Sequence, residues 1–162
     1  MQKILRLPEG LTGQEPALVD DRWPNLVTQA QFLADPAAHA GAGQTLGVRV
    51  APADPVEALA PHLSRVALVA IEFPGPGEGR GYTYARLLRQ RYRFQGEIRA
   101  VGPAVKQDLL FFMRRCGFDA FELAPGENLA EAHQALHRFT LAYQPAVPRA
   151  DIAEPRFTAA RH

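Results

Sequence analysis

The sequence contains little of several residue types on which common activities depend. A single cysteine, Cys116, excludes an internal disulfide and any all-cysteine zinc or iron–sulfur site within one chain. Ser64 is the only serine and lacks the motif that surrounds a hydrolase nucleophile. No apolar run approaches the roughly 18 residues of a membrane helix, and residues 1–10 lack the apolar stretch of a signal peptide. We therefore expect a cytoplasmic protein without a membrane partner.

Positive and negative charges are nearly equal in number. Eighteen Lys and Arg against seventeen Asp and Glu leave a net charge of +1, so bulk charge does not indicate a nucleic-acid partner. The 162 residues, 47% hydrophobic and 22% charged, are typical of one globular domain. We expect a single domain over residues 1–143, with its regular part at 46–142, and an extended or flexible tail at 144–162.

Strand-like and helix-like segments alternate in the regular part. Strands are expected at 46–50, 66–73, 97–101 and 118–123, and helices at 55–64, 83–92, 103–115 and 128–142. Asp54 and Gly117 are the expected N-cap of the first helix and stop of the third. Residues 1–33 suggest a short strand or hairpin and then a helix from about Asn25. The pattern predicts an α/β fold: a mostly parallel sheet of four or five strands with alternating helices, three-layer or half-barrel-like.

The predicted helix at 103–115 carries an apolar stripe that includes the lone cysteine at its end. At helical spacing this stripe consists of Val105, Leu109, Phe112, Met113 and Cys116. The stripe favours a buried, structural cysteine. A catalytic thiol is the alternative, because the neighbouring Arg114 and Arg115 would lower its pKa.

The small net charge hides an asymmetry along the chain. Between Glu78 and Arg115 there are nine basic and three acidic residues, which gives +6 and leaves −5 for the remainder. Arg86, Arg89 and Arg93 are predicted to share one helix face. That face is either solvated or a docking surface for an acidic partner protein. RNA is disfavoured, because no aromatic-rich strand motif accompanies the arginines.

The loop GPGEGRGYT (75–83) joins a buried strand to a helix. In parallel α/β sheets, ligands bind beyond the carboxyl ends of the strands, where this loop must lie. It satisfies neither the P-loop nor the dinucleotide-binding pattern. It is either a conformational loop or a site for a small anion such as sulfite, sulfate or phosphate. The predicted anion-binding residues are Gly79, Arg80, Gly81 and Thr83.

Three charged residues lie within or near the ends of the predicted strands. Glu72, Arg99 and Glu122 would converge if those strands are parallel neighbours. Such a group is either an acid–base or substrate-anchoring set, which makes these residues the catalytic candidates, or a structural ion-pair network. His133 and His137 have the spacing of a metal-binding pair, but no third ligand is placed, so no metal site is predicted.

Four motifs together resemble a known family. They are IEF, GRGYxxARxLR, GEIRAVG and RCGFDAFEL, which fall between residues 66 and 123. In this respect the chain is similar to the bacterial DUF934 family, whose members are described as putative oxidoreductases of sulfite reduction. The resemblance implies a role beside the enzymes of sulfite assimilation and assigns no catalytic residue.

The chain departs from the family pattern at three aspartates. Glu78 is a mild change in the glycine loop. Pro103 and Gln107 stand where the family has aspartates that either act as acids or start the following helix. No flavin, nicotinamide, haem or iron–sulfur signature is found, so the cofactor stays unknown. Two hypotheses follow: an oxyanion-binding component of sulfite or sulfate assimilation, or a non-catalytic module that docks an acidic partner. The oligomeric state is open, a homo-oligomer included.

Overall fold

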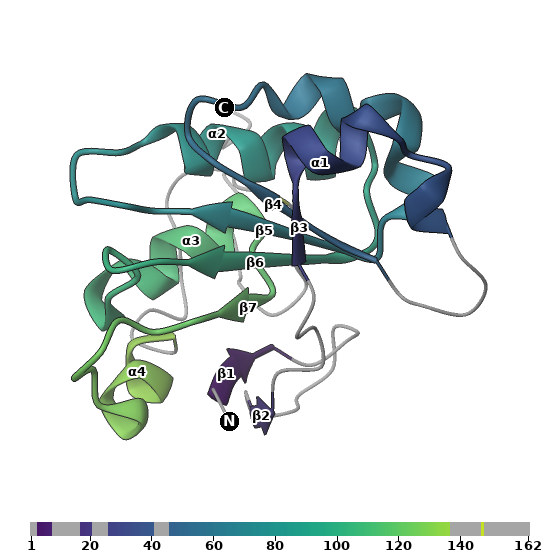
Figure 1. Cartoon of the computed structure of the whole chain (residues 1–162). Coiled ribbons are helices and arrows are strands. Elements are labelled where there is room, and N and C mark those ends of the chain that lie inside the picture. Colours follow the sequence, from purple (N-terminus) through teal and green to yellow (C-terminus); the bar gives the residue numbers. More distant parts are fainter. Residues whose placement is uncertain (1–2, 8–16, 21–25, 41–45, 137–146, 148–162) are drawn as a thin grey trace, which may run out of the picture.

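The strands form one mixed sheet (Figure 1). The computed structural model describes residues 3–7, 17–20, 26–40, 46–136 and 147. The sheet order is β2-β1-β7-β6-β5-β4-β3. The strands are β1 (Lys3–Arg6), β2 (Ala17–Asp20), β3 (Leu26–Thr28), β4 (Gly47–Val50), β5 (Leu68–Glu72), β6 (Glu97–Val101) and β7 (Ala120–Phe121). Strands β3 to β7 are parallel and lie in chain order, β1 is antiparallel to β7, and β2 is antiparallel to β1. The predicted mostly parallel α/β sheet is confirmed.

The helices lie on one face of this sheet. They are α1 (Gln29–Ala34), η1 (Ala38–Ala40), η2 (Val56–Arg65), α2 (Arg80–Arg86), η3 (Leu87–Arg91), η4 (Gln107–Leu109), α3 (Leu110–Cys116) and α4 (Leu129–Leu136). Each crossover from β3 to β7 moves one strand in the same direction. Right-handed crossovers of this kind place successive helices on the same side, as in half of a barrel. The half-barrel-like alternative predicted from the sequence is therefore the one that describes this fold.

The main core fills the space between sheet and helices. Val69 and Ile71 of β5 belong to one buried cluster with Ile98 of β6, whereas Leu68 and Ala70 do not. Leu88 and Met113 close this cluster from the helix side, and both are fully buried. Alternate residues of each strand therefore face the helices, and the residues between them form a second face.

The first predicted helix is correct in position but not in type. η2 is a 3-10 helix rather than an α-helix. It contains Pro61, which has no N–H for an α-helical hydrogen bond. Its N-cap is Pro55, and the predicted cap Asp54 instead accepts a hydrogen bond from the backbone N–H of Ala51 at 3.0 Å.

The predicted helix at 83–92 begins earlier and changes its winding. It starts at Arg80 as α2 and continues through η3, which is a π-helical turn. A π-turn adds a residue to the turn and rotates the side chains that follow it. The alignment of Arg86, Arg89 and Arg93 that α-helical spacing predicted is therefore lost.

The third predicted helix is shorter than expected. Residues 103–104 form a turn, residues 105–106 are irregular, and the helical conformation begins only at η4. The predicted apolar stripe is wrong at Phe112, which is 52% exposed, while Leu110 and Phe111 are buried. Gly117 is confirmed as the helix stop: it has a φ of 110°, a left-handed conformation that glycine adopts without strain.

The chain ends are described only in part. β1 and β2 form the hairpin expected near the amino end, and β3 precedes the expected helix, α1. α4 accounts for the first part of the predicted helix at 128–142, and the rest lies outside the described residues. Of the predicted tail, Val147 is described. It is buried, and its N–H donates to the carbonyl of Arg115 at 3.0 Å.

Candidate functional site

The sheet face opposite the helices carries a row of arginines, and we call it the polar face. Strand register places Arg49, Ala70, Arg99, Ala120 and Arg6 opposite one another across five adjacent strands. Neighbouring strands are about 4.8 Å apart, so alternate members of the row are separated by roughly 10 Å at the backbone. The alanines leave room between the arginines for the long guanidinium-bearing side chains.

The middle of the polar face is a buried cluster of three charges. Arg99 is 1% exposed, and its Nε and Nη2 atoms each lie 2.9 Å from Oε1 of Glu97. Arg6 donates from Nη2 to Oε2 of the same carboxylate. Two guanidinium groups thus share one carboxylate. Such buried charges are tolerated when they are paired and hydrogen-bonded.

On β4, at the other end of the row, the polar face is more exposed. Arg49 is 43% exposed at its side chain, and its Nε lies 3.5 Å from Oε1 of Glu72. This contact is an ion pair and not a hydrogen bond, because the Nε is buried and donates to no described residue. It is the only ion pair or hydrogen bond of the Arg49 side chain within the described part of the chain.

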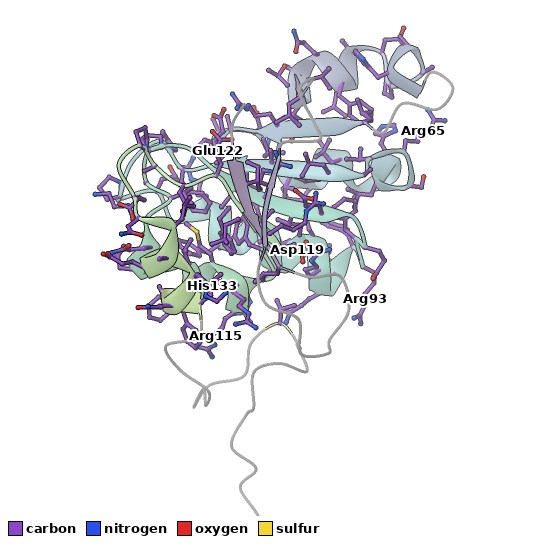
Figure 2. The ribbon with its side chains drawn as sticks, turned by 90° about the horizontal axis from the view of Figure 1, so that it is seen from below. Arg65, Arg93, Arg115, Asp119, Glu122 and His133 are labelled. Atoms are coloured by element: carbon purple, nitrogen blue, oxygen red, sulfur yellow. The ribbon has the colours of Figure 1, made fainter. Side chains whose placement is uncertain are left out.

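The three predicted catalytic candidates lie near one another on the same face without forming a triad. Glu72 is paired in register with Val101, and the N–H of Glu122 donates to the carbonyl of Ala100 on the same strand. Both glutamates therefore flank the end of β6, one position beyond the arginine row. Glu72 pairs with Arg49, and Arg99 pairs with Glu97. Figure 2 shows Glu122 far from Arg65 and Arg93, which precede β5 and β6.

The glycine loop lies at the carboxyl edge, as its position in the sequence predicts. Arg80 is 64% exposed and donates from Nη1 to the carbonyl of Pro52, beyond the end of β4. Gly81 is buried, and a Cβ added there would lie 2.5 Å from the ring of Phe73, so close packing requires this glycine. A Cβ added at Gly79 would lie within 4 Å of no other atom counted, so packing does not require a glycine there. Thr83 is exposed.

The predicted arginine surface divides into two parts. Arg86 and Arg93 are exposed. Arg89 is 15% exposed at its side chain and donates to the carbonyls of Gly117, Phe94 and Gly96 and to the carboxylate of Asp119. It cannot serve as a docking residue there, because the π-helical turn directs it inward. Its guanidinium ties the end of the helix to the starts of β6 and β7.

The cysteine environment favours the structural interpretation. Cys116 is half-buried, and burial raises the pKa of its thiol, while the nearby charges of Arg86 and Arg115 lower it by less. A raised pKa leaves the thiol protonated at neutral pH, whereas a catalytic nucleophile needs the thiolate.

The remaining sequence candidates give no further site. His137 lies outside the described residues, and its predicted partner His133 lies in α4. Within the described ranges, no three His, Cys, Asp or Glu side chains are grouped as metal ligands. The helices described are too short or too polar to cross a membrane.

Gln107, which stands where the family has an aspartate, contacts glutamates of a later segment. The N–H of Gln107, at the start of η4, donates to Oε2 of Glu127 at 2.8 Å, and its side-chain amide donates to Glu131. Glutamates of the following segment thus hold the start of this helix.

Sequence reasoning missed Arg6, Arg49 and Glu97. Each lies in a short strand that combines charged and apolar residues: KILR, GVRV and EIRAV. A charge inside an otherwise apolar strand was the available signal. That the three arginines form one row follows from the register between strands, which a single sequence does not show.

Five parallel strands in chain order, with helices on one face and a charged opposite face, define a half-barrel α/β protein. The chain belongs to the DUF934 family: the model of that family, described as a bacterial protein of unknown function, matches residues 47–154. This range includes β4 to α4. A search of curated proteins finds no match.

Proposed function

We propose that this chain binds a small sulfur oxyanion, sulfite or sulfate, at the carboxyl edge of the polar face. In this proposal it is a cytoplasmic component of assimilatory sulfite or sulfate reduction. The observation that carries the proposal is Arg49: a partly exposed guanidinium group with donors that no described residue uses.

The surroundings of Arg49 support an anion rather than a cation. Two further guanidinium groups, those of Arg6 and Arg99, lie in the same row across the sheet as Arg49. Within a protein, a guanidinium group binds an oxyanion by parallel N–H donors in forked geometry. Phosphate offers the same oxygen geometry and is therefore the natural competitor.

Arg80 is the second donor proposed for this site. Its guanidinium donates to Pro52, three residues beyond Arg49 in the sequence, and has further N–H groups at an exposed position. Gly79, Gly81 and Thr83 remain predicted members of the anion site. Glu72 would then hold Arg49 in place, and Glu122 would border the site as the half-buried carboxylate on the far side of Val101.

The connection to sulfur metabolism rests on the family. DUF934 members are described as putative oxidoreductases of sulfite reduction, and oxyanion binding at Arg49 is compatible with that description. No cofactor motif is recognised in the chain. We therefore propose that electrons come from a partner enzyme of sulfite assimilation while this chain binds the anion.

Thermal unfolding in the presence of sulfite, sulfate, phosphate and chloride at equal ionic strength tests the proposal. A ligand that binds the folded state alone raises the midpoint. Sulfite or sulfate should raise it more than chloride, and Arg49→Gln should remove the difference. Arg65→Gln is the matched control, because Arg65 is exposed and lies far from Glu122 (Figure 2). Equal shifts with all four salts, or an Arg49→Gln protein that responds like the parent, would refute the site.

A further inference from the structure

A surface between α2 and α3 combines an exposed aromatic ring with basic groups. We call it the α2–α3 surface and define it by Tyr82, Arg86, Phe112, Arg115 and Cys116. Phe112 is 52% exposed and is the one large hydrophobic residue classed as exposed in the described part of the chain. Arg86 is exposed, and the other three are half-buried.

Several contacts place these residues together. The two helices pack against each other. A Cβ added at Gly117 would lie 3.7 Å from the carbonyl of Ala85, so the end of α2 with Arg86 adjoins the end of α3 with Cys116. On α3, the rings of Phe112 and Phe111 are edge to face at 5.9 Å, and the Arg115 guanidinium lies 5.8 Å from the Phe111 ring centre.

The composition of this surface is that of a protein interface. Aromatic and arginine side chains are enriched at the centres of interfaces and contribute most of the binding energy there. An aromatic ring left half exposed on a helix beside a tyrosine and a thiol gains from burial against a partner. Arg86 makes no ion pair or hydrogen bond through its side chain with any described residue, so it can pair with a carboxylate.

The charge of the surface favours an acidic partner, because Arg86 and Arg115 give it two positive charges against the one negative charge of Asp108, which acts on Tyr82. The segment from Glu78 to Arg115 carries an excess of six positive charges. Three of its basic residues are turned inward: Arg89 and Arg99 pair with Asp119 and Glu97, and Arg114 donates to the carbonyl of Leu136. Most of the others are exposed: Arg80, Arg86, Arg91, Arg93 and Lys106.

We infer that the α2–α3 surface docks an acidic protein segment that has an apolar anchor. The anchor packs on Phe112, and its flanking carboxylates pair with Arg86 and adjoin Arg115. This inference does not depend on Arg49, which lies on the face of the sheet opposite the helices, although Tyr82 adjoins the predicted anion-site residues Gly81 and Thr83. It replaces the surface predicted from Arg86, Arg89 and Arg93, of which Arg86 is retained.

Selection of a random peptide display library on the immobilised full chain tests the inference. Peptides that combine Asp or Glu with an aromatic or aliphatic residue should be enriched. A synthetic peptide of the selected sequence should bind Phe112→Ser and Arg86→Glu about tenfold more weakly or worse. Both positions are exposed, so circular dichroism should show an unchanged fold.

Two charge reversals serve as matched controls. Arg93→Glu removes the same charge from the surface originally predicted, and Arg93 lies well away from Arg115 in Figure 2. Arg65→Glu reverses an exposed charge at the end of η2. Both should bind the peptide within about twofold of the parent protein. A loss of binding in Arg93→Glu comparable to that in Arg86→Glu would overturn the assignment to α2 and α3.

Other outcomes also decide against the inference. Selection of no peptide, or of neutral or basic peptides, excludes an acidic partner. Dimerisation of the chain that depends on concentration and is lost in Phe112→Ser would assign the surface to a second copy instead. Peptide binding that is unaffected by both Phe112→Ser and Arg86→Glu would place it elsewhere on the molecule.

Discussion

The two faces of the sheet use the same strands in opposite ways. Ile98 and Arg99 are neighbours on β6, and both are almost completely buried. Ile98 belongs to the apolar cluster under the helices, whereas Arg99 is held by the carboxylate of Glu97. One face is stabilised by removing apolar surface from water, and the other depends on keeping buried charges paired. The helix face therefore tolerates small changes, and the polar face does not tolerate the loss of its shared carboxylate.

The largest effect is expected on the polar face. Glu97→Ala leaves the buried groups of Arg6 and Arg99 without their common partner, which should lower the free energy of unfolding by about 3–5 kcal/mol. Urea denaturation followed by circular dichroism measures this loss. Glu57→Ala, at an exposed position, is the control and should stay within about 0.5 kcal/mol. A Glu97→Ala protein as stable as this control would show that the two faces do not differ as described.

A smaller effect is expected one residue away, on the helix face. Ile98→Val removes one methylene group from the apolar cluster and creates no unpaired charge. The free energy of unfolding should fall by about 0.5–1.5 kcal/mol in the same denaturation experiment. If Ile98→Val cost as much as Glu97→Ala, the contrast between packing and charge pairing along β6 would be wrong.

The smallest effect concerns the thiol in the helix layer. Burial raises the pKa of Cys116, so the folded protein holds this proton to higher pH than the unfolded chain does. Its contribution to stability is full below the ordinary thiol pKa and is lost as pH rises through the folded value. Iodoacetamide should therefore modify Cys116 more slowly in the folded protein than in urea at the same alkaline pH. Equal rates would indicate an accessible thiolate and revive the catalytic interpretation.

Much of the fold could be predicted because its signals are local. The strand at 97–101 is found at its predicted bounds, and the stop at Gly117 has the backbone conformation that glycine there suggests. The predicted helices were wrong in type or winding where the backbone hydrogen-bonding pattern departs from that of an α-helix. Pro61 accompanies a 3-10 helix, and the π-helical turn at 87–91 moves Arg89 from the surface to the interior.

The candidate site was only partly predictable, because it depends on pairing between distant strands. The end of β5 indicated Glu72 and β6 indicated Arg99, and both lie on the polar face. Their partners Arg49 and Glu97 were not recognised, since an isolated charge in a short strand does not show what it faces. The face on which each residue lies follows from the alternation of side chains, but the row across five strands requires the register.

The shared carboxylate also has a consequence for the order of folding. Glu97 and Arg99 come from one strand and meet as soon as it forms, whereas Arg6 is separated from Glu97 by 91 positions in the sequence. Contacts at such separation form late, because a long loop must close first. A chain that has assembled β4 to β7 still lacks the guanidinium group that completes the cluster. Docking of the amino-terminal hairpin is therefore the step that finishes the interior of the half-barrel, and its rate should limit the recovery of the native state after dilution from denaturant.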